Sequence, residues 1–325
     1  MMLDADIRLR QGSFALDAVF AAPHGITALF GPSGSGKSTV LSALAGLKRI
    51  HGHVYLNDRD LKDVAPYRRG VGLVFQDARL FPHLNVRQNI AYAWDRAPRR
   101  IVPTLEDIAR FFDIAAQLDR PVANLSGGEK SRVALARAVA AAPDFLLLDE
   151  PFAALDGARR RAFMRVLLEM HRAYNLPMMV VTHDIEDAAA LASHLVALRA
   201  GRVVAQGAFS KVSGEAAFRA LLDARDIGAA VPAHFLRSAH APFEQALWLR
   251  ADHVLIAAEL PRAISARNVL EGEIAAITPE PGGSHLVTLS TGAGTILSRL
   301  TGEAVHDLQL APGNKAWALV KAHAL

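Results

Sequence analysis

Short runs of apolar residues recur through the first two thirds of the chain, and each is followed by a loop or a helical pattern. The clearest runs are Ile26–Phe30, Val71–Phe75, Phe145–Leu148 and Met178–Val181. Four or five apolar residues without alternation are typical of strands buried on both faces of a parallel sheet. Two helical patterns between them cover Lys130–Ala142 and Gly157–Tyr174. This alternation predicts an α/β domain whose ligand binds beyond the carboxyl ends of the strands.

The pattern changes after about Gly207. Residues 208–230 are partly helical, and from Val231 onward the chain consists of short β-like runs. Turns rich in glycine and proline separate these runs, most clearly over 279–283. Such spacing is typical of a small all-β barrel or sandwich. We therefore expect a connecting region over 208–261 and a compact all-β domain over 262–325.

The composition is that of a folded chain. Its 325 residues fit two domains of roughly 150 residues each. Hydrophobic residues make up 51% and charged residues 21%, which excludes a disordered chain, and a net charge of +4 does not favour a nucleic-acid partner. The absence of cysteine suits a reducing compartment. We expect no secretory signal, and the apolar stretch Ala188–Leu198 falls short of the ~20 residues that span a bilayer, so any link to a membrane must run through a partner.

A glycine-rich loop follows the run that ends at Phe30. It consists of Gly31, Pro32, Ser33, Gly34, Ser35, Gly36, Lys37 and Ser38, and Thr39 continues into a helical pattern. This is the phosphate-binding pattern in its expected place between a strand and a helix. Its backbone N–H groups would surround phosphates, Lys37 would reach the β- and γ-phosphates, and the Ser38 hydroxyl would bind Mg²⁺.

Two acidic residues end the apolar run that begins at Phe145. Asp149 is expected near the metal, beside the phosphate loop. Glu150 points in another direction along the strand and could orient and deprotonate the attacking water. An apolar run followed by two acids is commonplace by itself, and it gains meaning from the phosphate loop.

A third motif, Leu125 to Glu129, indicates the class of ATPase. Ser126 and Glu129 form a capping box, so an ordinary helix start is the alternative. However, Gly127 and Gly128 in the first turn cost roughly 1 kcal/mol each against alanine, which a cap alone does not require. The motif resembles the LSGGQ signature of ABC ATPases, which faces the γ-phosphate of ATP bound by a second subunit. Glu129 stands where that signature has glutamine, and we expect it to face the helix dipole or a cation rather than the nucleotide.

The resemblance to ABC ATPases covers Ile26 to about Gly207 and implies further site residues. Gln76 matches the Q-loop glutamine that contacts Mg²⁺ and the water. Residues 151–156 match the D-loop, which passes between two subunits. His183 matches the switch histidine, which contacts the γ-phosphate and positions the catalytic glutamate.

The resemblance also implies the fold and the assembly. It implies an α/β P-loop NTPase domain over 1–207, with a helical subdomain over about 77–142, followed by a small OB-like β-barrel. Two copies would close head-to-tail on two MgATP molecules, and each site would take Ser126–Gly128 from the other copy. The family stacks adenine on an upstream aromatic residue; Phe14 is our choice and Phe20 the other candidate, and core packing is the alternative for both.

Two segments of the C-terminal domain indicate the class of transported substrate. Residues 264–272 resemble the opening of the Mop/TOBE-type barrels attached to molybdate importer ATPases, and Lys321–His323 resembles their end. The proposed oxyanion ligands, which together offer charge, hydroxyl, amide and N–H groups, are Ser265, Ala266, Arg267, Asn268 and Lys321. A polar turn that enters a strand is the alternative.

Residues 78–89 resemble the importer form of the region that receives the coupling helix of a membrane subunit. The sequence therefore predicts the ATPase subunit of a molybdate importer at the cytoplasmic face of the inner membrane. Its partners would be a permease dimer and, indirectly, an external molybdate-binding protein, while molybdate at the barrel would regulate the ATPase. Tungstate and sulfate remain alternative substrates. A soluble ABC protein of DNA repair or translation, and a molybdate storage or sensing protein with a degenerate ATPase, are the rival classes.

Overall fold

The computed structural model describes residues 2–98, 103–153, 155–236 and 246–321. The chain forms two compact units. The first comprises Met1–His183 with Val196–Gln206, and the second comprises Asp184–Leu195 with Gly207–Leu325. Within the described ranges, no helix is long and apolar enough to cross a membrane.

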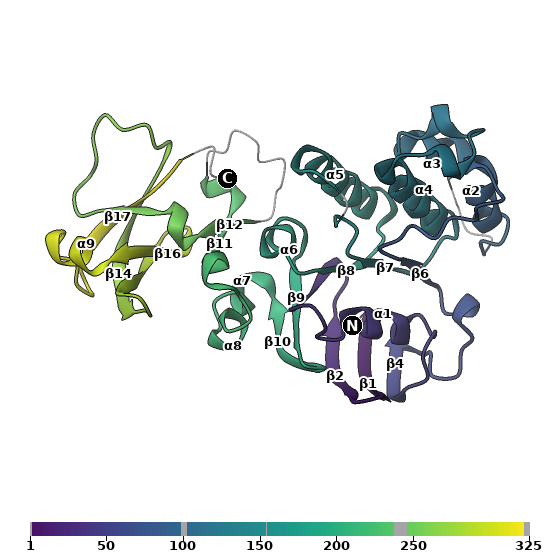
Figure 1. Cartoon of the computed structure of the whole chain (residues 1–325), viewed down its shortest axis with the longest axis horizontal. Coiled ribbons are helices and arrows are strands. Elements are labelled where there is room, and N and C mark those ends of the chain that lie inside the picture. The colour runs from purple at the N-terminus through teal and green to yellow at the C-terminus, as the bar shows by residue number, and fades with distance from the viewer. Residues whose placement is uncertain (1, 99–102, 154, 237–245, 322–325) are drawn as a thin grey trace. The chain divides into compact units, whose positions relative to one another are not determined.

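A ten-stranded sheet runs through the first unit (Figure 1). Its strands in spatial order are β5 (Arg59–Asp60), β4 (His51–Leu56), β1 (Leu3–Gln11), β2 (Phe14–Ala22), β10 (Arg202–Ala208), β9 (His194–Arg199), β3 (Ile26–Phe30), β8 (Met178–Thr182), β7 (Phe145–Asp149) and β6 (Val71–Val74). Strands β3, β8, β7 and β6 are parallel, whereas β1 pairs antiparallel with β2 and β4. The four apolar runs of the sequence are these parallel strands, and β3 and β8 are buried throughout, as predicted.

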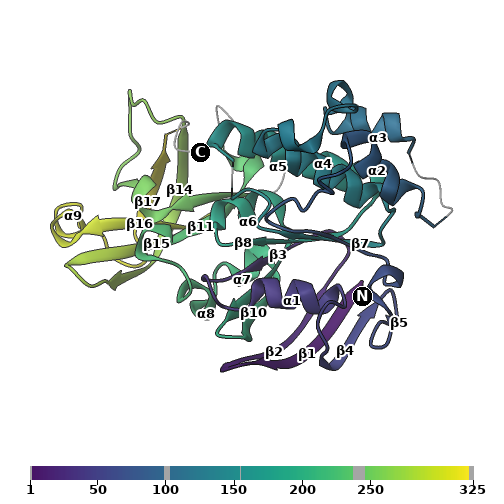
Figure 2. The same cartoon turned by 45° about the vertical axis from the view of Figure 1, so that its right-hand side comes forward.

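Helix α1 (Lys37–Leu44) lies between the parallel strands and the antiparallel strands of this sheet (Figure 2). Its buried side chains Val40 and Leu41 share one hydrophobic core with Leu3 of β1 and Leu147 of β7. Burial of these apolar surfaces holds the amino end of α1 close to the carboxyl ends of the parallel strands. The loop between β3 and α1 is therefore fixed at both ends.

Three further helices pack against one another in the first unit: α2 (Val86–Trp94), α3 (Leu105–Phe111) and α4 (Gly127–Ala140). Each begins with a capping box, at Asn85, Thr104 and Ser126 respectively. The capping box at Ser126 explains why α4 starts at Gly127 rather than at Lys130, where the apolar pattern begins. Helix α5 (Gly157–Tyr174) has the predicted bounds and stops at Asn175, whose φ is 48°.

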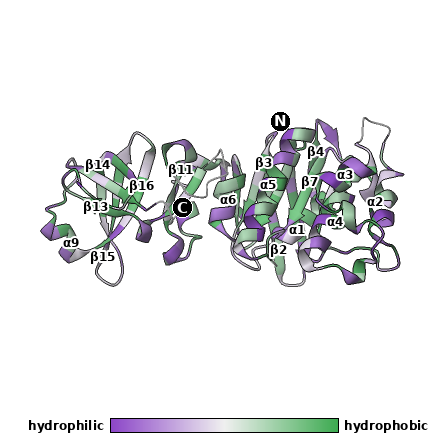
Figure 3. Cartoon of the chain, turned by 90° about the horizontal axis from the view of Figure 1, so that it is seen from above, coloured by the Kyte–Doolittle hydropathy of each residue, from purple (hydrophilic) through white to green (hydrophobic). Residues whose placement is uncertain are grey.

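The second unit is mainly β-structure, with hydrophobic residues concentrated in its strands (Figure 3). Its five-stranded antiparallel sheet has the order β13 (Leu255–Ala257), β17 (Lys315–Val320), β14 (Asn268–Pro279), β15 (Ser284–Thr291) and β16 (Gly294–Thr301). A two-stranded sheet of β11 (Gly228–Pro232) and β12 (Ala246–Arg250) packs on β16. The helices are α6 (Ile185–Leu191), α7 (Phe209–Val212), α8 (Ala216–Arg219) and α9 (Gly302–Asp307).

The core of this β-structure begins earlier in the chain than the predicted barrel. Val231 of β11, Leu249 of β12 and Val254 share one hydrophobic core with Ile274 of β14 and Ile296 of β16. These early strands lie within the stretch 208–261 that the sequence pattern assigned to a connection. The short β-like runs predicted from Val231 onward are confirmed by β11, β12 and β13. Because each strand is only three to five residues long, its pattern did not indicate that it shares a core with the later strands.

Candidate functional site

The phosphate loop joins β3 to α1 and depends on its glycines. Gly34 and Gly36 have φ values of 77° and 106°, a region that residues with side chains rarely adopt. A Cβ on Gly36 would lie 2.7 Å from Cζ of Phe14, whereas a Cβ on Gly34 would meet no described atom within 4 Å. The backbone at Gly34 is therefore open to a ligand, and Gly36 is the N-cap of α1, where free N–H groups favour anions.

Lys37 holds its ammonium group inside this loop. The Nζ atom donates to the carbonyl oxygens of Gly31 at 2.7 Å and Pro32 at 2.9 Å. Burial lowers the pKa of Lys37, while the neighbouring carboxylates of Glu150 and Asp149 raise it. A partly buried cation within the phosphate loop is suited to neutralise the charge of a bound triphosphate.

Two of the three predicted metal ligands, Ser38 of α1 and Asp149 of β7, are in direct contact. The Ser38 hydroxyl donates to Oδ1 of Asp149 at 3.1 Å, although 111 positions separate the two residues. Burial raises the pKa of Asp149, and Glu150 raises it further, while the bond from Ser38 and the charges of Lys37 and Arg79 lower it. Mg²⁺ accepts one or two protein oxygens together with water and phosphate oxygens. The residues present therefore fit this ion.

The predicted catalytic residues follow three neighbouring parallel strands. Glu150 follows β7 and His183 follows β8, and His183 Nδ1 lies 3.3 Å from Oε1 of Glu150. Glu150 has a φ of 45°, a left-handed conformation that is unusual for this residue type and changes the direction of the strand at the site. Gln76 is exposed, two positions beyond β6, which pairs with β7. The sheet thus brings the ends of these strands to one edge.

A cavity of about 500 Å³ lies over the phosphate loop. It is lined by Gln11, Phe14, Ser33, Gly34, Gly36, Lys37, Ser38, Thr39 and Glu150. Phe14 lines this cavity, whereas Phe20 is 2% exposed and packs in the core around α1.

Sequence reasoning missed two residues of this region. Gln11 lines the cavity and pairs directly with Phe14 in the register of β1 and β2. The two-residue turn Gly12-Ser13, with φ of 59° at Gly12, was the available signal, because such turns place their flanking residues opposite each other. Arg79, whose charge lowers the pKa of Asp149, carried no signal of this kind.

The signature segment has its own environment. Glu129 Oε2 accepts the backbone N–H of Ser126 at 2.7 Å, and Oε1 lies 3.5 Å from Arg120. The hydrogen bonds from Ser126 and the charge of Arg120 hold the pKa of Glu129 below its ordinary value. The expectation that Glu129 faces the helix dipole and a cation is confirmed. A Cβ on Gly127 would meet no described atom within 4 Å, so the backbone of this first turn is open.

This segment lines a separate cavity of about 310 Å³. Ser126, Gly128, Arg132 and Arg159 are among its lining residues, and none of them lines the cavity over the phosphate loop. Within one copy, therefore, the signature segment and the phosphate loop do not form one pocket. Ala154 of the predicted D-loop lies outside the described residues, and Asp156 caps α5.

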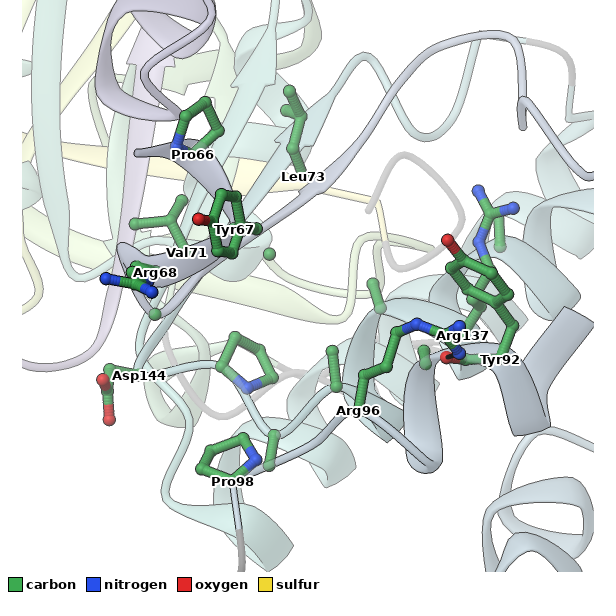
Figure 4. A pocket seen from close by; sticks show the side chains of 18 of the residues that line it. Pro66, Tyr67, Arg68, Val71, Leu73, Tyr92, Arg96, Pro98, Arg137 and Asp144 are labelled. Carbon is green, nitrogen blue, oxygen red and sulfur yellow. Dashed lines mark hydrogen bonds between the residues drawn. The ribbon is translucent and has the colours of Figure 1, made fainter. Parts of the chain in front are cut away.

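A further cavity of the first unit, about 740 Å³, lies between the β6 region and helices α2 and α4 (Figure 4). Tyr67 and Arg68 lie on one side of it, and Tyr92, Arg96 and Arg137 lie on the other (Figure 4). Tyr67 is 81% exposed, and the guanidinium of Arg96 lies 3.9 Å from the ring centre of Tyr92. Exposed aromatic and cationic side chains around a hollow are typical of protein interaction sites.

The two predicted oxyanion segments lie side by side in the second unit. Asn268 opposes Val320 in the register of β14 and β17, so Lys321 follows directly beside residues 265–268. Asn268 is buried, and its Nδ2 donates to the Val320 carbonyl at 3.3 Å. Ser265, Arg267 and Lys321 are exposed and Ala266 is half-buried. Ala322 and His323 of the predicted closing segment lie outside the described residues.

Two family models match parts of this chain. Residues 20–153 match the family model of the ABC transporter, and residues 264–325 match the TOBE domain. The chain is 37% identical to the molybdenum import ATP-binding protein ModC of Rhodospirillum rubrum, over 100% of this chain and 97% of that protein. It is equally identical to the protein of the same name from Rhizobium meliloti, over 100% of this chain and 99% of that protein.

Solved structures show the same fold for the ATPase part. One is a dimeric ATP-binding cassette in a post-hydrolysis state bound to ADP and Pi, with a TM-score of 0.57 and 25% identity over 64% of this chain and 98% of that chain. Another is a component of an ABC transporter complex from Clostridium perfringens, with a TM-score of 0.54 and 24% identity over 66% of this chain and 91% of that chain. Because its full-length relatives are molybdenum import ATP-binding proteins, the chain belongs to this family of ABC transporter ATP-binding proteins.

Proposed function

We propose that the chain is the ATP-hydrolysing subunit of a molybdate importer and acts as a head-to-tail dimer on a separate permease. The observation that carries the ATPase assignment is the convergence of Lys37, Ser38, Asp149, Glu150 and His183 at one edge of the sheet. The names of the relatives that align with the whole chain support molybdate as the transported substrate.

In the proposed reaction, Glu150 orients a water molecule and accepts its proton at a carboxylate oxygen. His183, 3.3 Å away, holds that carboxylate and can donate to an oxygen of the γ-phosphate. Lys37 neutralises charge on the phosphates, and Mg²⁺ held by Ser38 and Asp149 would supply further charge neutralisation. Catalysis would consist mainly of positioning and charge stabilisation, as is general for phosphoryl transfer.

The second copy would complete each site. The open first turn of α4 and its separate cavity support this arrangement, because Ser126–Gly128 would then face the nucleotide bound by the other copy. Backbone N–H groups at a helix start favour an anion, and glycine allows it to approach closely.

The cavity of Figure 4 is our candidate for the permease contact. It is lined by the exposed Tyr67 and by arginines on three segments, Arg68, Arg96 and Arg137. A helix of the permease with an apolar face and acidic residues would complement it. Contact with the permease would hold the chain at the cytoplasmic face of the inner membrane. An external molybdate-binding protein would deliver molybdate to the permease.

The C-terminal domain is our candidate for a regulatory molybdate site. Ser265, Arg267 and Lys321 are exposed around the buried Asn268, so their donors are available to an anion or to a second barrel. Deleting residues 262–325 would be a poor test, because Val231 and Leu249 share the core that this deletion removes. The full chain with Arg267→Gln should instead lose inhibition of its ATPase by molybdate, and unchanged inhibition would remove Arg267 from the proposal.

Reconstitution tests the transport function. The chain, its permease and the external binding protein in lipid vesicles should take up molybdate only with MgATP, and Lys37→Met should abolish uptake. Tungstate and sulfate are measured in the same vesicles. Uptake of sulfate without molybdate would contradict the proposed substrate, and ATP hydrolysis without uptake of any of the three oxyanions would contradict the proposed transport role.

A further inference from the structure

The loop that follows Gln76 contains a strained residue. Arg79 has a φ of 44°, in the left-handed region that residues other than glycine rarely adopt. Its guanidinium lies 3.7 Å from the ring centre of Phe75 and donates to Asp77 at 3.1 Å. These two contacts hold the Arg79 side chain against its own loop.

Arg137, a side chain of α4, contacts backbone carbonyls of this loop. Its Nη2 donates to the carbonyl oxygens of Arg79 at 2.9 Å and Ala78 at 3.4 Å. Its guanidinium also lies 4.9 Å from the ring centre of Phe81. Burial lowers the pKa of Arg137, and the two carbonyl contacts replace part of the hydration of its charge.

Asn89 of α2 forms hydrogen bonds with the backbone of the same loop. Its fully buried side chain accepts the Phe81 N–H at 2.9 Å and Nη1 of Arg137 at 3.4 Å. Its Nδ2 donates to the carbonyl oxygens of Phe81, Leu84 and Asn85 at 3.0–3.2 Å. Since these contacts use both the donor and the acceptor groups of the amide, the loop is bound firmly to α2 and α4 together.

We propose that Arg137 is a positioning residue that couples the conformation of loop 77–85 to the orientation of α4. Arg137 stands ten residues after Gly127, at which α4 begins, a distance of roughly 15 Å along the helix. A helix of this length moves as a rigid rod, so a change of the loop shifts Ser126 and Gly127 at the other end. The inference rests on the proposed function, because it requires that these residues face the nucleotide of a second copy.

Two substitutions at Arg137 test this coupling in the full chain. Arg137→Gln removes the charge and these contacts. Arg137→Lys keeps the charge but lacks the planar guanidinium, whose Nη2 contacts two carbonyls while Nη1 contacts Asn89. Both should lower kcat for ATP by at least about tenfold and change the KM for MgATP by less than about twofold. Arg110→Gln is the matched control, since Arg110 is exposed on α3 and pairs only with Asp107 among the described ion pairs. It should keep the full kcat.

A substitution at position 79 separates positioning from folding. Glycine at position 79 adopts a positive φ without strain, so Arg79→Gly should reduce the dependence on Arg137. In that background, Arg137→Gln should lower kcat by less than about threefold. An equal loss in both backgrounds, or a wild-type kcat in both Arg137 variants, would overturn the inference. If the melting temperature of Arg137→Gln lies far below that of the unchanged chain, the kcat of Arg137→Lys is used to judge the inference instead. Absence of ATP hydrolysis in the unchanged chain would overturn the proposed function as well.

Discussion

Replacement of Gly127 by alanine should move stability and activity in opposite directions. Gly127 is exposed in the first turn of α4, its φ is outside the left-handed region, and a Cβ there would meet no described atom within 4 Å. Alanine at such a position stabilises a protein by about 0.4–1 kcal/mol, mainly by restricting the unfolded chain. For a domain of this size, the melting temperature should rise by about 1–4 °C.

The activity of Gly127→Ala should fall. In the proposed dimer, the γ-phosphate of the ATP bound by the second copy approaches the backbone of Gly127. The methyl group of alanine would displace this phosphate by roughly 1 Å. A displacement of this size costs about 100-fold in rate, equivalent to about 2.7 kcal/mol of transition-state stabilisation. The affinity of a single copy for MgATP should not change, because the phosphate loop is untouched.

The assay combines thermal unfolding, equilibrium nucleotide binding and steady-state ATP hydrolysis on the purified variants. Gly157→Ala is the matched control: it also occupies the first position of a helix, after the N-cap Asp156, and its Cβ would only approach Arg161 at 3.6 Å. It should gain similar stability and keep its turnover. A Gly127→Ala variant with wild-type kcat would refute the assignment of this turn to the nucleotide site of a second copy.

Two further substitutions test other parts of the site. Glu150→Gln removes the base beside His183, so kcat should fall by about 10²–10⁴-fold while MgATP still binds normally. ATP-bound dimers should accumulate in sedimentation experiments, and full turnover would contradict the role of Glu150 as the base. Glu129→Gln should melt below the unchanged chain at pH 7, since Ser126 and Arg120 hold the pKa of Glu129 below its ordinary 4.5. A lowered carboxyl pKa stabilises the fold above pH 4.5, and this contribution is lost as the pH falls through the lower folded value. The difference in melting temperature should therefore vanish at acidic pH, and a difference that persists there would contradict the role of the charge.

Local patterns predicted the parts of the molecule that depend on neighbouring residues. The apolar runs predicted β3, β6, β7 and β8, because a strand buried on both faces requires consecutive apolar residues. The phosphate loop was predicted because its glycines adopt backbone conformations that other residues avoid. The capping box of Ser126 and Glu129 was also predicted from its residues. The resemblance of this segment to the LSGGQ signature then linked these motifs to the ABC ATPases.

Sequence reasoning was weakest where strands were short or contacts lacked a motif. The β-like runs from Val231 onward were predicted, but the segment 208–261 was expected to be a connection, whereas Val231, Leu249 and Val254 are part of the β core. Gln11 at the cavity over the phosphate loop and the contacts of Arg137 with the loop after β6 were not predicted. An arginine in a helical pattern is ordinarily a solvated side chain, so nothing in the neighbouring sequence indicates these contacts.

The sequence by itself determined which residues could form a phosphate site, a metal site and a catalytic pair. Only the tertiary structure decided that Ser38 reaches Asp149 across 111 positions and that His183 lies 3.3 Å from Glu150. The order and register of the parallel strands set these distances, and neither is encoded in the local spacing of apolar residues. They arise from the shared core of α1 and the sheet, whose burial holds the separate strand ends at one edge.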